Sequence, residues 1–401
     1  MKRSKKRFIW IIIAILLMAG SSLSAYFILN TQKQTNITDD VPVSQHEDLK
    51  STSKAEQILT EMTLEEKIGQ MFMVDTADLE HGTRTSDNEL SLNEAQKANL
   101  AQYGLGGVIF FAGNIQSAEQ VQSYINELQA NSKYPLLVST DQEGGSVDRL
   151  ANAGITHFGN MADIGATGDP DNAYQVGATY GKEMRNLGFN VNLAPIADIN
   201  TNPNNPVIGV RSFGNDASLV AKMVASEVRG LQDNNISAAL KHFPGHGDTS
   251  ADTHTGMATI DHDINRLREI ELVPFKSGIE ADAGMVLAAH IKLPNVDAED
   301  IPASMSKTLI ADILRGEMGY NGVVITDALD MGAIAQYYTN EQVVEKCIEA
   351  GVDILLMPVN YFEAYETLLN LVNSGTVPQS RIDESVLRIL NLKLKFNVMP
   401  N

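Results

Sequence analysis

Eight short apolar runs, separated by segments with helical periodicity, are the feature that most constrains the fold of this chain. The runs lie at residues 70–74, 107–111, 135–139, 190–195, 237–241, 285–289, 323–326 and 352–357. Strict alternation of strand and helix favours a parallel sheet, because each helix carries the chain back to the start of the next strand. Eight such units over about 340 residues predict an α/β fold, a closed (β/α)₈ barrel of the TIM type. We expect one domain spanning residues 54–401.

The predicted helices carry recognisable signals at their ends. Ser117 and Asp216 precede helical stretches as expected N-caps, and Thr63 with Glu66 has the spacing of a capping box. The single cysteine, Cys347, lies within a helical stretch and has no partner for a disulfide. We therefore expect Cys347 to be a small buried apolar residue.

The N-terminus predicts export. Five positive charges precede an uncharged, largely apolar segment, residues 8–29, which is long enough to cross a membrane. Residues 1–29 are therefore either a signal anchor or a signal peptide cut near Ala25. Residues 30–53 are polar, without apolar periodicity, and predict a flexible linker. We expect the domain to face outward from the cell membrane, or to be secreted if the segment is cleaved.

The charge of the chain argues against a nucleic acid partner. The formal net charge is −20, and the first seven residues alone contribute five positive charges. The remainder therefore carries −25, which is typical of a soluble, self-repelling surface.

Polar residues follow the predicted strands, where a barrel carries its functional groups. Asp327 directly follows the run that ends at Thr326, and a carboxylate at the tip of a buried strand is costly unless it serves a purpose. The other residues found just past a run are Asp75, Asn114, Asp141, Arg149, Asp198, Arg211, Lys241, His242 and His290. At the opposite ends of the strands, glycines such as Gly104 and Gly188 indicate only that the chain turns.

The segment 241–254 contains three histidines and two aspartates. Imidazole and carboxylate ligands suit zinc or iron, but the intervening Gly, Pro, Ser and Thr residues lack the rigid spacing of a metal site. We prefer to interpret Asp252 and His254 as a pair that projects from the same side of an extended loop. The carboxylate then holds the imidazole in one tautomer, ready to transfer a proton. We expect no metal and no cofactor.

Three separated motifs resemble the β-N-acetylhexosaminidases of glycoside hydrolase family 3 (the NagZ type). They are residues 141–145, residues 241–254 with their Asp-Thr-His end, and residues 326–331. The likeness extends from about Glu61 to the last helix. One departure is Ser146, where the family usually has arginine, and we expect it to affect only the rim of the pocket.

The resemblance implies roles for individual residues. Asp327 matches the nucleophile that forms a covalent glycosyl intermediate with retention of configuration. His254 matches the general acid/base and Asp252 its dyad partner. The residues that match those holding N-acetylglucosamine are Asp141, Arg149, Arg211, Lys241 and His242.

The implied function is that of a glycoside hydrolase, an exo-β-N-acetylglucosaminidase that releases terminal N-acetylglucosamine from cell-wall fragments, as in peptidoglycan turnover, or from related oligosaccharides. The chemistry agrees, because an oxocarbenium-like transition state needs an anion beneath C1 and a proton for the leaving oxygen. Three alternatives remain open: a phosphorylase using the same site, a β-glucosidase of the same family, and a glycan-binding module without catalysis. A muropeptide, a wall disaccharide and a chitin fragment all fit as substrates, and the oligomeric state is open.

Overall fold

The structure is a computed structural model that describes residues 53–400 except 82–83, 87 and 255. The predicted signal segment and nearly all of the predicted linker lie outside these residues. Within the described part, no helix combines the length and the apolar character needed to cross a membrane.

Eight parallel strands form the central sheet, and each of them overlaps one of the eight apolar runs. The strands are hydrogen-bonded side by side in the order β11-β9-β7-β6-β3-β2-β1-β12. The strands are β1 (Phe72–Asp75), β2 (Gly107–Phe110), β3 (Leu137–Thr140), β6 (Val191–Asn192), β7 (Ser237–Phe243), β9 (Met285–Ala288), β11 (Val323–Thr326) and β12 (Leu355–Leu356). Their residues are buried, as expected for a parallel sheet covered by helices.

The two ends of this sheet meet. A parallel bridge joins Ile325 to Ile354, just before β12. The Thr326 N–H donates to the Ile354 carbonyl at 3.1 Å, and the Ile354 N–H donates to the Val324 carbonyl at 3.0 Å. The sheet is therefore a nearly closed barrel, in agreement with the predicted α/β architecture.

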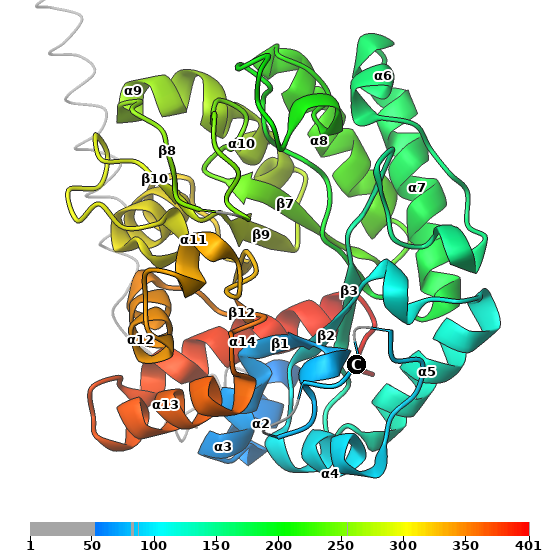
Figure 1. Cartoon of the computed structure of the whole chain (residues 1–401), viewed down its shortest axis with the longest axis vertical. Helices are drawn as coiled ribbons and strands as arrows, with labels where there is room; N and C mark the ends of the chain where they lie inside the picture. The colour runs from blue at the N-terminus through cyan, green and yellow to red at the C-terminus, as the bar shows by residue number, and fades with distance from the viewer. Residues whose placement is uncertain (1–52, 82–83, 87, 255, 401) are drawn as a thin grey trace, which may run out of the picture. The chain divides into compact units, whose positions relative to one another are not determined.

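Helices surround the strands in Figure 1. They are α2 (Lys54–Glu61), α3 (Leu64–Gln70), α4 (Glu94–Tyr103), α5 (Ala118–Asn131), α6 (Met161–Ala166), α7 (Pro170–Leu187), α8 (Ala217–Gln232), α9 (Ile264–Arg266), α10 (Leu272–Glu280), α11 (Gly332–Ala335), α12 (Asn340–Ala350), α13 (Tyr361–Asn373) and α14 (Gln379–Lys395). Two π-helical segments are η5 (Leu267–Glu271) and η7 (Thr308–Glu317). Short 3₁₀ turns are η1 (Thr76–Asp78), η2 (Ala112–Asn114), η3 (Ala151–Ala153), η4 (Gly209–Arg211) and η6 (Ala303–Met305).

Short strands outside the barrel form two small ribbons. β4 (Gln142–Gly144) pairs with β5 (Val147–Asp148) in antiparallel fashion, and β8 (Ala258–Thr259) pairs with β10 (Ile291–Lys292) in parallel. All four strands lie in segments that follow the carboxyl ends of barrel strands. They therefore help to build the mouth of the barrel.

The predicted helix signals are confirmed. The Ser117 hydroxyl accepts from the Gln120 N–H, the Asp216 carboxylate accepts from the Leu219 N–H, and Thr63 forms a full capping box with Glu66. Cys347 is buried in α12, as predicted.

The sequence showed turn glycines at the amino ends of the strands. The structure also places a buried carboxylate there, which these glycines did not predict. Asp353, just before β12, is fully buried and accepts from Arg315 at 2.6 Å and Arg388 at 3.0 Å. It also accepts from the Ser385 hydroxyl at 2.6 Å and the Val324 N–H at 2.9 Å. Side chains and backbone of the protein therefore satisfy the Asp353 carboxylate. It joins the strands to α14, which is a structural role.

Candidate active site

A cavity of about 310 Å³ opens at the carboxyl ends of the strands. Of the eight predicted site residues, seven line it: Asp141, Arg149, Arg211, Lys241, His242, His254 and Asp327. Asp252 is not part of the lining but contacts His254 from behind. Charged or polar lining residues without a predicted role are Glu143, His246, Thr253 and Asp330. The structure therefore brings the predicted residues to one place, although their roles stay predictions.

Asp327 is the first residue after β11. Its Oδ1 accepts from the Ala328 N–H at 2.9 Å, and among the described residues it forms no ion pair. Burial would raise the pKa of its carboxyl, but electrostatic interaction with the His242 and His290 imidazoles and the hydrogen bond from the Ala328 N–H lower it below the ordinary value. Asp327 is therefore an ionised carboxylate at neutral pH, with its charge available to a ligand.

His290 supports the segment that follows Asp327. Its Nε2 donates to the Ala328 carbonyl at 2.9 Å, and its Nδ1 lies 2.8 Å from the Ser304 hydroxyl. Because the imidazole is fully buried, its pKa is lowered. A neutral ring with both nitrogens engaged fixes the backbone beside the nucleophile candidate.

Asp252 and His254 form the predicted pair, but not in the predicted way. His254 Nδ1 lies 2.7 Å from Asp252 Oδ1, and the His254 backbone N–H donates to the same oxygen at 2.9 Å. The expectation of an extended loop was wrong: residues 253–254 form a turn, and the turn directs both N–H groups at the carboxylate. Because Nδ1 carries the hydrogen donated to Asp252, Nε2 is the nitrogen left for proton transfer.

The turn that carries His254 is attached to the segment after Asp327. The Gly332 N–H donates to the His254 carbonyl, and the Ala333 N–H donates to the Thr253 carbonyl, both at 3.2 Å. Gly332 and Ala333 begin α11. The carboxylate and the imidazole therefore lie on segments that are bonded to each other.

Four charged groups form the floor of the cavity. Lys241 Nζ lies 2.6 Å from both Asp141 Oδ1 and Glu143 Oε1. The Arg211 guanidinium donates two hydrogen bonds to the Glu143 carboxylate, at 2.8 and 2.7 Å. Burial would raise the pKa of Glu143, but Lys241 and Arg211 hold it far below its ordinary value. The floor is therefore a charged network assembled before any ligand arrives.

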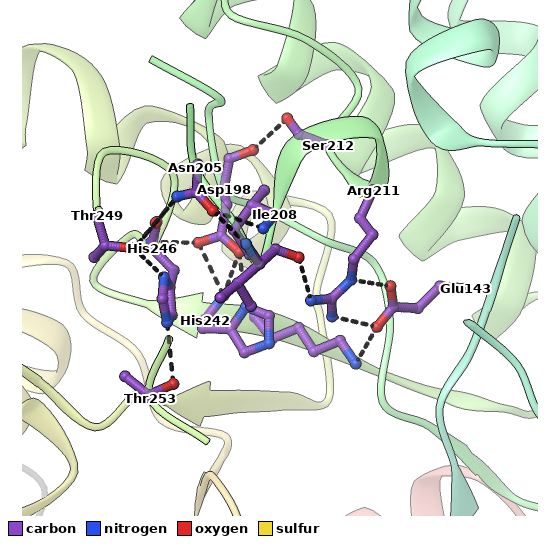
Figure 2. Close-up of polar contacts among 12 residues, drawn as sticks. Glu143, Asp198, Asn205, Ile208, Arg211, Ser212, His242, His246, Thr249 and Thr253 are labelled. Atoms are coloured by element: carbon purple, nitrogen blue, oxygen red, sulfur yellow. Dashed lines mark hydrogen bonds and ion pairs between the residues drawn. The ribbon is translucent and has the colours of Figure 1, made fainter. Parts of the chain in front are cut away.

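A second network positions His242. The buried Asp198 carboxylate accepts from His242 Nδ1 at 2.7 Å, from the His242 N–H at 3.2 Å and from the His246 N–H at 2.6 Å. Lys241 and His242 are joined by a cis peptide bond, and both line the cavity. Figure 2 shows Asp198 beside the two histidines and the Arg211–Glu143 pair next to them. His242 thus presents Nε2 to the cavity in a fixed orientation.

Arg149 differs from the other cations of the cavity. Its guanidinium lies over the ring of Phe111, 5.8 Å from the centroid, and its buried Nε has no hydrogen-bond partner among the described residues. A buried donor without a partner is costly. The arrangement suits a ligand oxygen that would complete its bonding.

The three histidines of residues 241–254 have separate partners. His242 is held by Asp198, His254 by Asp252, and His246 by two threonines. In the described part of the chain, no group of three or more His, Cys, Asp or Glu residues is arranged to hold a metal ion. Each of these imidazoles is therefore held by its own partner through at least one ring nitrogen.

Sequence reasoning gave no role to Glu143 or His246. Glu143 lies two residues after Asp141, and alternate residues of a strand project to the same side, so its spacing was a usable signal. His246 gave no such signal, because its partners Thr249 and Thr253 are set by the path of the loop.

Comparison with known proteins agrees with this geometry. Residues 63–392 match the family model described as glycosyl hydrolase family 3 N terminal domain. Beta-hexosaminidase A of Pseudoalteromonas piscicida is 39% identical over 325 residues, which is 74% of this chain and 54% of that protein. A beta-N-acetylglucosaminidase/beta-glucosidase of Cellulomonas fimi is 31% identical over 344 residues, 84% of this chain and 58% of that protein. The chain thus spans little more than half the length of these two relatives.

A solved structure is similarly close. The glycoside hydrolase family 3 beta-N-acetylglucosaminidase from Paenibacillus sp. str. FPU-7 has a TM-score of 0.78 and 41% identity. The match covers 85% of this chain and 64% of that one. The resemblance of the three motifs is therefore confirmed over most of the barrel, and the chain belongs to glycosyl hydrolase family 3.

Proposed function

We propose that this chain is a retaining exo-β-N-acetylglucosaminidase. The observation that carries the proposal is one cavity shared by an ionised Asp327 and by His254, whose Nδ1 is held by Asp252. The names of the relatives, beta-hexosaminidase and beta-N-acetylglucosaminidase, support the choice of sugar. The proposed substrates are cell-wall fragments or related oligosaccharides with a terminal β-linked N-acetylglucosamine.

In the first step, an Asp327 oxygen attacks C1 of the sugar and the bond from C1 to the leaving oxygen breaks. The leaving oxygen takes the proton from His254 Nε2, so the aglycone departs as an alcohol. Asp252 stabilises the imidazolium that gives up this proton. The product of the step is a glycosyl ester of Asp327 and a neutral His254.

In the second step, water attacks C1 from the side that the aglycone has left. His254 Nε2 takes a proton from this water, and the bond between C1 and Asp327 breaks. The sugar leaves with its original anomeric configuration and the enzyme returns to its starting protonation. No cofactor is needed in either step.

The floor is suited to hold the sugar hydroxyls. Asp141 accepts hydrogen bonds, while Lys241, Arg211 and His242 donate them, and Arg149 has a free donor. These groups are fixed by their mutual bonds before the sugar binds, which lowers the entropic cost of orienting it.

Hydrolysis fits the charges of the cavity better than phosphorolysis. Carboxylates outnumber full cations in the lining, with Asp141, Glu143, Asp327 and Asp330 facing Arg149, Arg211 and Lys241. Two of these cations are already paired with Glu143. The net negative charge of the site would therefore repel an incoming phosphate, whereas a neutral water molecule would not be repelled.

We also propose that residues 8–29 either anchor the enzyme in the cell membrane, facing outward, or direct its secretion. The support is the basic segment followed by an apolar stretch long enough to span a bilayer. This location would place the enzyme next to the cell wall, in agreement with a role in peptidoglycan turnover.

The test uses the purified chain and an aryl N-acetyl-β-glucosaminide. We expect turnover by the parent chain and by Asp312→Ala, which changes an exposed aspartate of η7, and none by Asp327→Ala. Undiminished turnover by Asp327→Ala would refute the assignment. The matching aryl glucoside should react more slowly, and phosphate should change neither the rate nor the product. A phosphorylated sugar product would instead establish the phosphorylase.

A further inference from the structure

Thr253 is buried in a turn whose neighbouring side chains are exposed. Its residue exposure is 1%, while the side chains of Asp252 and His254 are 39% and 63% exposed. The Thr253 hydroxyl lies 3.2 Å from His246 Nε2 (Figure 2). The residue between the members of the dyad therefore points inward, away from the pair itself.

His246 is a fixed partner for this hydroxyl. Its Nδ1 lies 2.8 Å from the Thr249 hydroxyl, and its backbone N–H donates to Asp198 Oδ1 at 2.6 Å. Asp198 also holds the His242 ring. Hydrogen bonds through His246 and Asp198 thus connect Thr253 to His242, which lines the cavity.

The imidazole of His246 is neutral near neutral pH. Burial, together with the charge of His242, lowers its pKa to about 4. A neutral ring has one donor nitrogen and one acceptor nitrogen, and each can form a hydrogen bond with one of the two threonine hydroxyls. The contact with Thr253 therefore keeps the same form across the pH range in which a histidine transfers protons.

The turn has a second set of contacts on its other side. The Thr253 and His254 carbonyls accept from the Ala333 and Gly332 N–H groups of α11, both at 3.2 Å. The turn is therefore attached to α11 through its backbone and to His246 through the Thr253 side chain.

We propose that Thr253 is a positioning residue: its hydroxyl ties the turn to His246 and thereby sets His254 relative to Asp327. Neither end of this contact has to touch the reacting atoms. The proposal rests on the proposed function, because it requires His254 to donate and accept the proton. It predicts that loss of the hydroxyl impairs proton transfer while leaving the nucleophile and the sugar floor intact.

The experiment measures how the rate depends on the leaving group. In the full chain, Thr253→Val should lower kcat/KM for phenyl N-acetyl-β-glucosaminide by about 10- to 100-fold, because phenol needs a proton to depart. For the 2,4-dinitrophenyl substrate, whose leaving group needs no proton, kcat/KM should fall by less than about 3-fold. Azide, which attacks without a base, should raise kcat of the variant on this substrate and give a glycosyl azide.

Two variants serve as controls. Thr253→Ser keeps the hydroxyl and should retain the leaving-group dependence of the parent chain. Thr259→Val removes an exposed hydroxyl from β8, shortly after the turn, and should behave like the parent chain. If Thr253→Val does not fold, His246→Leu cuts the same contact from the other end and should give the same pattern.

The proposal is overturned by equal losses on both aryl substrates without a response to azide, because that pattern belongs to a merely structural residue. Unchanged kinetics of Thr253→Val would overturn it as well. A parent chain that hydrolyses neither substrate would instead refute the proposed function, so the two failures are distinguishable.

Discussion

The floor and the rim of the cavity both pair carboxylates with nitrogen donors, yet they are built differently. On the floor, the side chains of Glu143 and Lys241 are each 3% exposed and that of Arg211 is 16% exposed. At the rim, Asp252 and His254 are 39% and 63% exposed. Glu143, Lys241 and Arg211 each contact two or more groups, whereas Asp252 and His254 contact each other on an exposed turn.

This difference matches what each region has to do in the proposed reaction. Groups that bind a sugar gain from being rigid and charged before it arrives. A group that gives up a proton in one step and takes one in the next needs access to the leaving aglycone and to water. In the proposed reaction, the buried groups would bind the sugar and the exposed pair would transfer the proton.

Asp327→Ala removes the carboxylate that both regions serve and should have the largest effect. We expect kcat to fall by about 10⁴-fold or more, as for loss of a nucleophile, with thermal stability nearly unchanged. Steady-state kinetics and thermal unfolding check both parts. Residual turnover within about 10-fold of the parent chain would contradict the role of Asp327 on which the comparison depends.

His254→Ala tests the rim. We expect kcat/KM for an unactivated aryl substrate to fall by about 10²- to 10⁴-fold, the usual contribution of a general acid or base. The free energy of unfolding should stay within about 1 kcal/mol, because the side chain is mostly exposed. A large loss of stability would show that the rim contributes to the free energy of unfolding as the floor does.

Glu143→Gln tests the floor. The change leaves Lys241 and Arg211 buried with one carboxylate fewer, and breaking such a pair costs about 3–5 kcal/mol. Urea unfolding should show this loss, and KM should rise. An unchanged free energy of unfolding would contradict the account of the floor.

Asp252→Asn is the matched change at the rim. Stability should fall by less than about 1 kcal/mol, because exposed pairs contribute little. Turnover of an unactivated substrate should fall by about 10- to 100-fold, since the amide no longer stabilises the imidazolium. If this variant loses as much stability as Glu143→Gln, the distinction between the two regions fails.

The pH dependence of stability sharpens the same contrast. Glu143 has an ordinary pKa of 4.5, and despite its burial the charges of Lys241 and Arg211 lower the pKa in the folded state. Its contribution is therefore complete above about pH 4.5 and is lost as the pH falls toward the folded value. The stability gap between the parent chain and Glu143→Gln should narrow from pH 6 to pH 3. A gap that widens on acidification would contradict this assignment.

The fold could be predicted because its signals are local. Each barrel strand overlaps an apolar run, and residues such as Ser117 and Thr63 cap their helices through neighbours three residues away. The closure between Ile325 and Ile354 follows from the number of units rather than from any single residue.

The candidate site was predictable only in part. Asp327 and the Asp252–His254 pair were found because strand ends and close spacing mark them. The hydrogen bonds of Asp198 to His242 and His246 cross more than forty residues, so no local pattern announces them. The turn at His254 was missed because its geometry comes from the Asp252 oxygen accepting two N–H groups.

The central claim is that Asp327 forms a covalent bond to the sugar. The most direct test is mass spectrometry of the enzyme after reaction with a 2-fluoro N-acetylglucosaminide analogue or another slow substrate. The account predicts a sugar adduct on the peptide that contains Asp327, absent from Asp327→Ala. An adduct on a different carboxylate, or substrate turnover by Asp327→Ala at the parent rate, would contradict it.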